Sequence, residues 1–155
     1  MADPVPATPL PWVIYCDGSA MPNPGRMGIG AVFIEPNGTR HTLSQATNTK
    51  GCNNEAELRA LMAALRELQT RGATALLVYC DNSVLVEQLC GADVKPVVRL
   101  ASIFEEARAL LKSFNHASLE WIPRHRNGEA DALARAALGI TPKRPVKPSK
   151  NQRQF

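Results

Sequence analysis

Two aspartates, Asp17 and Asp81, each follow an apolar stretch and share the tripeptide Tyr-Cys-Asp. The stretches cover residues 12–16 and 75–80, and their length and β-branched content predict buried strands. If these strands are parallel neighbours, both carboxylates lie at the carboxyl edge of a sheet, where open α/β sheets bind their ligands. No lysine or arginine lies within five residues of Asp81. A buried carboxylate needs a partner, so this pattern predicts a metal ion.

Two further acids, Glu57 and Asp131, lie near the predicted starts of helices. Each has an ordinary structural explanation as well: Glu57 lies three residues after Asn54, as in a capping box, and Asp131 suits the dipole of the last helix. Four carboxylates converging on one sheet edge would repel one another unless divalent cations neutralised them. Oxygen ligands favour Mg²⁺ or Mn²⁺ over zinc. Two such ions are a general device for cleaving a phosphodiester.

The remaining pattern predicts the elements that position these acids, namely a mixed five-stranded sheet with helices on its faces. The predicted strands cover residues 12–17, 28–35, 39–47, 75–80 and 118–122, with a turn-rich loop at 18–25. The predicted helices run from Asn53-Asn54 to Arg71, from Asn82 or Ser83 to Cys90, from Lys95-Pro96 to Leu111, and from Asn127 to Leu138.

The chain of 155 residues has the length of one domain. We expect a Pro-rich disordered lead-in at residues 1–11, a folded domain at 12–140 and a basic Pro-rich tail at 141–155. The folded domain carries 13 basic and 13 acidic residues, so the net charge of +4 comes from the five basic residues of the tail, less the charge of Asp3. Such a tail is typical of a nucleic-acid-binding arm, and equally of a solvated disordered segment.

Cysteine content and hydropathy restrict the class of protein further. No apolar run approaches the roughly 20 residues of a membrane span, and the first residues lack a signal-peptide pattern, so we expect a cytoplasmic protein. The four cysteines have no C-x-x-C spacing, which disfavours a zinc site. Cys16 and Cys80 lie within apolar stretches and are expected to be core residues.

Six short motifs, in this order, resemble those of the type 1 ribonuclease H family over about residues 12–139. They are Asp17-Gly18-Ser19, Asn23-Pro24-Gly25, Asn53-Asn54-x-x-Glu57-Leu58, Asp81-x-Ser83, Trp121-x-x-x-His125, and Asn127 followed by Ala130-Asp131-x-Leu133-Ala134.

The resemblance implies a ribonuclease H-like α/β fold with the strand order 3-2-1-4-5 and helices on both faces of the sheet. It also implies that residues 12–140 form a catalytic domain that hydrolyses the RNA strand of RNA/DNA hybrids. Two Mg²⁺ ions would act with the substrate, Mn²⁺ could substitute for them, and the products would carry 5′-phosphate and 3′-hydroxyl ends. The expected protein is a monomer.

Site residues follow from the resemblance position by position. The metal-binding acids would be Asp17, Glu57, Asp81 and Asp131, and Glu57 would also contact the ribose 2′-hydroxyl that distinguishes RNA from DNA. His125 resembles a mobile histidine that assists the attacking water or product release, although a histidine between two arginines is also an ordinary surface residue. Asn23, Asn53 and Asn54 would contact the minor groove of the hybrid, and all three also suit turns or caps.

The chain differs from longer members of the family in two places. No Lys/Trp-rich protrusion lies between Asn82 and His116, so the chain is a short form, and its only aromatic residues there, Phe104 and Phe114, suit a core. Cys52 stands where many members have a threonine that holds a DNA phosphate. We hypothesise that the basic tail supplies part of the missing affinity for nucleic acid. Deletion of the tail without a change in KM or its salt dependence would contradict this hypothesis.

Two other functions compete with hybrid cleavage. The chain could be a binding module that retains the fold without turnover, although a pure binder has no reason to crowd carboxylates against phosphates. It could also be another nuclease of the same fold, such as a junction resolvase or an integrase-like enzyme. The motif Asn53-Asn54-x-x-Glu57 favours hybrid recognition over these alternatives.

Overall fold

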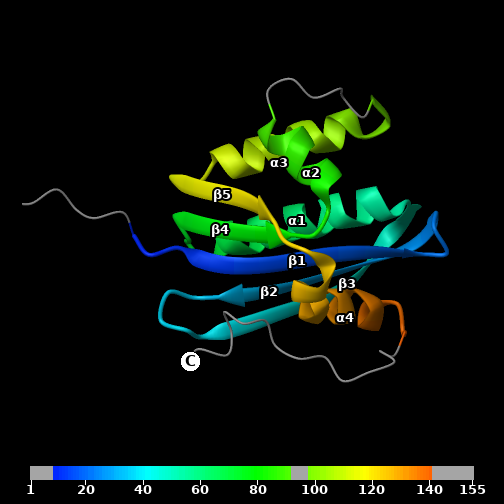
Figure 1. Ribbon diagram of the computed structural model, residues 1–155, viewed down its shortest axis with the longest axis horizontal. Helices are drawn as coiled ribbons and strands as arrows, with labels where there is room; N and C mark the ends of the chain where they lie inside the picture. Colours follow the sequence, from blue (N-terminus) through cyan, green and yellow to red (C-terminus); the bar gives the residue numbers. More distant parts are fainter. Residues whose placement is uncertain (1–8, 92–97, 141–155) are drawn as a thin grey trace, which may run out of the picture.

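The computed structural model describes residues 9–91 and 98–140. They form a mixed five-stranded sheet in the order β3-β2-β1-β4-β5 (Figure 1), which confirms the predicted fold and strand order. The strands are β1 (Trp12–Met21), β2 (Gly25–Ile34), β3 (Arg40–Gly51), β4 (Ala75–Cys80) and β5 (His116–Trp121). Strands β1, β2 and β3 are antiparallel neighbours, whereas β4 runs parallel to both β1 and β5.

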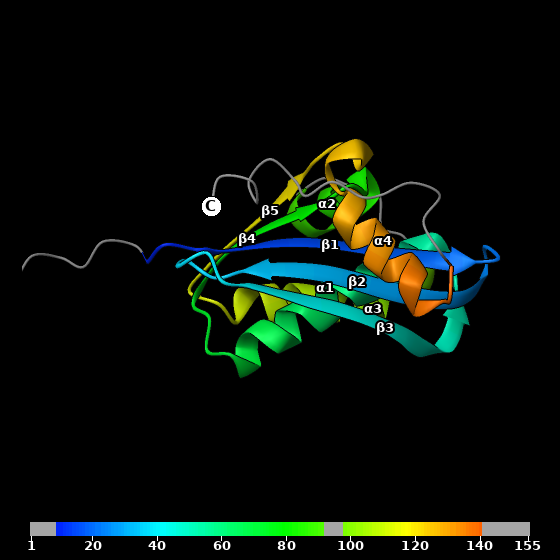
Figure 2. The ribbon, with the colours of Figure 1, turned by 90° about the horizontal axis from the view of Figure 1, so that it is seen from below.

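Helices cover both faces of this sheet. The helices are α1 (Asn53–Thr70), α2 (Ser83–Cys90), α3 (Ala101–Lys112) and α4 (Gly128–Ala137), with short 3₁₀ helices η1 (Val98–Leu100) and η2 (Arg124–Arg126). Helices α1 and α3 lie on one side of the sheet and α4 lies on the other (Figure 2). Within the described residues, no helix is both long and apolar enough to cross a membrane.

Strand β1 is longer than the predicted 12–17, and the predicted loop at 18–25 is shorter than expected, a turn at residues 22–24. Gly18 and Ser19 lie inside the strand because β2 pairs with β1 as far as Met21, leaving only a short turn between them. The glycine serves packing rather than a turn here. A Cβ atom at Gly18 would overlap the backbone carbonyl of Ala56. The missing side chain therefore lets α1 approach the strand closely.

Other strand boundaries shift for the same reason, since pairing extends beyond the apolar runs. Strand β2 begins at Gly25 rather than at residue 28, β3 continues to Gly51 rather than 47, and β5 begins at His116 rather than 118. Most of β5 is exposed, so its side chains carry a weak hydrophobic signal.

The core lies mainly between α1 and the sheet. The predicted apolar stripe of α1 is buried, with each member at most 2% exposed; its members are Leu58, Leu61, Met62, Leu65 and Leu68. Cys16 and Cys80 pack in this core as predicted, and Phe104 and Phe114 are buried as well. Burial of such a stripe is the main source of stability for a helix of this kind.

Helix starts agree with the sequence only in part. Asn82 caps α2 as predicted, its side chain accepting a hydrogen bond from the Leu85 amide. The cap of α1 is Cys52, whose sulfur accepts from the Glu55 amide, and not Asn53 or Asn54. Glu57 consequently lies beyond the capping positions, and the capping-box explanation does not hold for it.

The structure does not test the predicted domain boundaries. The tail 141–155, most of the lead-in 1–11 and the predicted helix start at 95–96 lie outside the described residues. The proposed roles of those segments stay predictions.

Candidate active site

Three carboxylates meet near the carboxyl end of β4. Asp17, Glu57 and Asp81 each offer an oxygen, and these oxygens all lie within 4.8 Å of one another. The parallel pairing of Tyr15 with Tyr79 places Asp17 and Asp81, each two residues further on, level with each other. Asp81 directly follows β4, whereas Asp17 lies inside β1, which continues to Met21. Helix α1 supplies Glu57 from its second turn.

These three acids lie where their carboxyl groups have limited contact with solvent. Asp17 is only 6% exposed. Burial raises its pKa well above the ordinary 3.8, and the hydrogen bond with Glu57 and the charge of Asp81 raise it further. Burial also raises the pKa of Glu57, as do the charge and hydrogen bond of Asp81, although the hydrogen bonds with Asp17 and Asn82 lower it. Across residues 9–91 and 98–140, no ion pair includes any of the three acids.

Neutral donors hold two of these carboxylates in place. The backbone amide of Gly18 donates to Asp17 Oδ1 at 3.0 Å. The Asn82 amide Nδ2 donates to Glu57 Oε2. Hydrogen bonds of this kind orient a carboxylate without cancelling its charge. The cluster therefore keeps the charge that a cation would neutralise.

Asn127 plays the corresponding role for Asp81. Its Nδ2 donates to Asp81 Oδ2 at 2.8 Å and to the Cys16 carbonyl at 2.9 Å, and the residue is 1% exposed. The Trp121 indole N–H donates to the backbone carbonyl of Asp81 at 3.2 Å. Two strands and the start of α4 thus fix the position of this aspartate.

Asp131 belongs to the same cavity but not to the group of three. It lies in the first turn of α4, and its carboxylate accepts from Arg135 Nε at 3.1 and 3.2 Å. Its charge is one of the factors that raise the pKa of Asp17. The i,i+4 spacing of Asp131 and Arg135 was visible in the sequence and could have revealed this pair.

The acids line a cavity of about 520 Å³ with polar walls. Three arginines that sequence reasoning did not assign to the site also line it, namely Arg99, Arg124 and Arg135. The predicted His125 is exposed in η2 and is not among the lining residues, although its neighbour Arg124 is. Positive charge at the rim and negative charge at the base suit a phosphate backbone held above a cation site.

The three predicted asparagines all line this cavity, and each also supports the fold. Asn23 Oδ1 accepts from the Asn53 amide at 3.1 Å, and Asn53 Oδ1 accepts from the Ala20 amide at 2.8 Å. Asn54 Oδ1 accepts from Asn82 at 2.8 Å. In each of these asparagines, the side-chain oxygen accepts a hydrogen bond from another residue of the protein.

Cys52 lies at the start of α1, beside Arg99. The Arg99 Nη2 donates to the Cys52 sulfur at 3.2 Å. Burial alone would raise the pKa of this thiol, but the guanidinium and the backbone amides of Glu55 and Asn54 lower it below the usual 9.0. The position taken by threonine in many family members thus carries a more acidic group here.

The donor set fits a hard divalent cation. All three clustered ligands are carboxylate oxygens, which Mg²⁺ and Mn²⁺ prefer. The nearby thiols are unsuited to zinc, because burial raises the pKa of Cys80 to about 12 and that of Cys16 well above its usual value. Protonated thiols do not ligate zinc.

Sequence comparison places the chain in a known family. The family described as "Reverse transcriptase-like" matches residues 15–137. The bifunctional protein Rv2228c of Mycobacterium tuberculosis is 36% identical over 127 residues, which are 81% of this chain and 35% of that protein. The chain therefore spans about a third of the length of this curated relative.

Solved structures give the same assignment. The ribonuclease H1 of Halobacterium salinarum superposes with a TM-score of 0.77 and 32% identity, covering 83% of this chain and 97% of that one. LC11-RNase H1, in a complex with an RNA/DNA hybrid, has a TM-score of 0.73 and 31% identity, covering 83% of this chain and 96% of that one. The chain belongs to the type 1 ribonuclease H family.

Proposed function

We propose that this protein is a metal-dependent endoribonuclease that hydrolyses the RNA strand of RNA/DNA hybrids and leaves 5′-phosphate and 3′-hydroxyl ends. The observation that carries the proposal is the cluster of three carboxylates, which has no basic partner among the described residues and lines a polar cavity. Membership of the family supports it, as does the likeness to LC11-RNase H1, which was solved with a hybrid.

Asp17, Glu57, Asp81 and Asp131 would hold two Mg²⁺ ions together with the substrate, or Mn²⁺ in their place. When bound, such ions activate water and stabilise the leaving oxygen. The protein contributes a fixed carboxylate frame, because neutral donors orient Asp17 and Asp81 while leaving their charge intact. Asp131 would be the peripheral member of this ligand set, because its carboxylate already forms an ion pair with Arg135.

Substrate recognition would use the residues around this frame. The Glu57 carboxylate would accept a hydrogen bond from a ribose 2′-hydroxyl, which DNA lacks. Asn23, Asn53 and Asn54 would face the minor groove of the hybrid from the cavity wall. His125 would assist proton transfer or product release, a role supported by its place in the family motif and by its position in η2 beside Arg124.

One assay tests this function and separates it from its rivals. A labelled RNA/DNA hybrid, duplex DNA, duplex RNA and a four-way DNA junction are each incubated with the protein over a titration of Mg²⁺ and Mn²⁺. We expect metal-dependent cleavage of the hybrid's RNA strand alone. Tight hybrid binding in EDTA without cleavage at any metal concentration would indicate a binding module, and junction cleavage would indicate another nuclease. A cytoplasmic location and a monomeric state stay predictions.

A further inference from the structure

Asn82 follows Asp81 directly and connects three parts of the site. Its Oδ1 accepts from the Leu85 amide at 3.2 Å and so caps α2. Its Nδ2 donates to Asn54 Oδ1 at 2.8 Å and also to Glu57 Oε2. One neutral side chain therefore joins a helix cap, a predicted substrate contact and a predicted metal ligand.

The chemistry of its partners fixes the orientation of this amide. The Leu85 backbone N–H only donates, so it requires the oxygen of Asn82. An ionised Glu57 carboxylate only accepts, so it requires the nitrogen. Both amide hydrogens and the oxygen of Asn82 are used at once.

The same bond fixes the orientation of Asn54. Because its Oδ1 accepts from Asn82, its Nδ2 is the end left for another partner. That nitrogen makes no hydrogen bond to residues 9–91 or 98–140, and Asn54 lines the cavity. Asn54 thus presents N–H donors to whatever occupies the cavity. Minor-groove edges of bases offer acceptors of the matching kind, N3 and O2.

We propose that Asn82 is a positioning residue that holds Glu57 in the carboxylate cluster and turns Asn54 so that it donates to a base or sugar acceptor of the bound nucleic acid. This inference rests on the proposed function for the identity of the ligand. The amide suits both tasks because it supplies two donors and no charge. A lysine or arginine here would neutralise the cluster, and an aspartate would offer no donor at all.

Substitution by serine separates this role from the cap of α2. Serine is a preferred N-cap residue, so Asn82→Ser keeps an acceptor for the Leu85 amide and adds no charge. Its single hydroxyl is too short to reach both Glu57 and Asn54. We expect a melting temperature close to that of the wild type.

The first measurement is hybrid binding in EDTA, compared in a double-mutant cycle with Asn54→Ala. We expect Asn82→Ser to weaken binding by up to about tenfold, the order expected for a misplaced hydrogen bond. The double variant should lose clearly less binding than the sum of the two single losses, because Asn82 acts in part through Asn54. A purely structural role for Asn82 would instead give additive losses.

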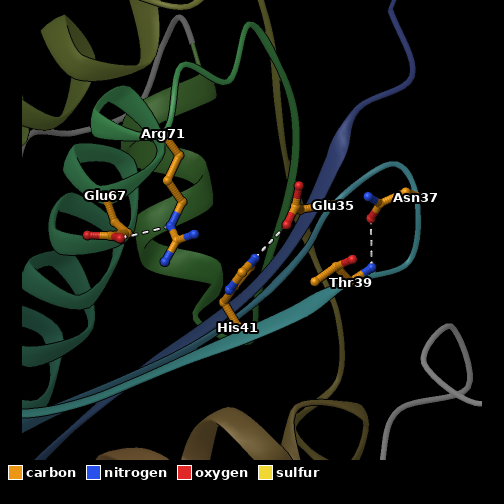
Figure 3. A network of polar contacts seen from close by, with 6 residues as sticks. All are labelled: Glu35, Asn37, Thr39, His41, Glu67 and Arg71. Carbon is orange, nitrogen blue, oxygen red and sulfur yellow. Dashed lines mark hydrogen bonds and ion pairs between the residues drawn. The ribbon is translucent and has the colours of Figure 1, made fainter.

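The second measurement is a calorimetric Mn²⁺ titration without nucleic acid. We expect Asn82→Ser to bind Mn²⁺ several-fold more weakly, because Glu57 loses the donor that holds it in the cluster. Asn82→Asp, which also retains the cap, carries the binding cycle should the serine variant fail to fold. Its matched control is Asn37→Asp, since Asn37 Oδ1 also accepts from a backbone amide, that of Thr39 at 2.9 Å, in a turn outside the cavity (Figure 3).

Wild-type hybrid and Mn²⁺ affinities in Asn82→Ser, or additive losses in the cycle, would overturn the inference. Neither measurement requires cleavage. A wild-type protein that binds hybrid without cleaving it would therefore refute the proposed function while leaving the test of Asn82 intact.

Discussion

Helix α1 carries acids near both of its ends, and their surroundings differ. Near its first residues, Glu57 meets Asp17 and Asp81, and no basic side chain pairs with any of them in the described part of the chain. Near its last residues, Glu67 Oε1 accepts from Arg71 Nε at 2.8 Å. Figure 3 shows this pair close to a second polar contact, in which Glu35 and His41 lie 2.6 Å apart.

The difference separates stabilising acids from functional ones. A surface acid that forms an ion pair contributes a small amount to stability whether or not a cation is bound. Three acids that face one another at a buried or partly buried position oppose folding until a cation joins them, and such a cost is typical of functional sites. Ten residues separate Glu57 from Glu67, or about 15 Å along a helix at 1.5 Å per residue. Perturbing one end of α1 should therefore leave the other largely unaffected.

The largest effect should come from Asp81→Asn. The amide keeps an oxygen for Asn127 but removes a charged ligand, so we expect kcat on the hybrid to fall by about a thousandfold or more. The melting temperature should not fall, because one repelling charge is gone. Steady-state kinetics and thermal unfolding measure the two effects.

The control is an acid outside the cluster, Glu35, which directly follows β2. Glu35→Gln removes a carboxylate that pairs with His41, and we expect unchanged kcat and KM. Robust cleavage by Asp81→Asn, or an equal loss in Glu35→Gln, would break the distinction between the two regions.

The next effect should come from Gly18→Ala, which tests how closely α1 must approach β1. The added methyl group would overlap the backbone carbonyl of Ala56, so helix and strand must separate. We expect a loss of about 3 kcal/mol in the free energy of unfolding, together with reduced activity as Glu57 moves away from Asp17. Gly72→Ala is the comparison. Its Cβ meets nothing within 4 Å and its φ of +75° gives only a small cost, about 1 kcal/mol, without loss of activity.

The pH dependence of the stability of the metal-free protein should also distinguish the acid cluster from the ion-paired acids. Burial, aided by Glu57 and Asp81, raises the pKa of Asp17 above 3.8, so the folded state binds this proton more tightly than the unfolded chain. Its contribution to stability is therefore present below the unfolded pKa and is lost as pH rises toward the folded value. Urea unfolding in EDTA should show Asp17→Asn gaining stability over the wild type as pH rises through this window. A difference that stays constant or shrinks with rising pH would contradict the raised pKa.

The smallest effect should come from Glu67→Gln. This pair with Arg71 is half-exposed and spaced i,i+4, so its loss should lower the free energy of unfolding by only about 0.3–0.5 kcal/mol. Cleavage and Mg²⁺ response should remain those of the wild type. A change in either would show that the far end of α1 is coupled to the cluster.

The strand order followed from the family resemblance. The sequence alone predicted a mixed five-stranded sheet, the buried stripe of α1 and the short helix after Asp81. These features depend on local signals: apolar runs, 3.6-residue periodicity and the capping preference of asparagine. The proximity of Asp17 and Asp81 could also be predicted from the sequence. Two neighbouring parallel strands that share the tripeptide Tyr-Cys-Asp place equivalent residues side by side. Glu57 could be grouped with these aspartates from its place near a helix start, and the family resemblance added its role as a metal ligand.

The features that the sequence did not predict depend on tertiary contacts. The Gly18-Ser19 dipeptide suggests a turn, but pairing with β2 and packing under α1 keep it in a strand. The bridging roles of Asn82 and Asn127 depend on partners that are distant in sequence, 25 residues away for Glu57 and 111 for Cys16. The approach of Arg99 to Cys52 spans 47 residues and left no local pattern.

Thermal unfolding with and without Mg²⁺ tests the central claim, that the clustered acids form a divalent-cation site. The wild type is compared with the double variant Asp17→Asn/Asp81→Asn over a Mg²⁺ titration. Without metal, we expect the double variant to melt at the higher temperature, because the repulsion is gone. Mg²⁺ should raise the melting temperature of the wild type only, with a stabilisation of about 2.7 kcal/mol at a hundred times the Kd. An equal Mg²⁺ response in both proteins, or none in the wild type, would contradict the account.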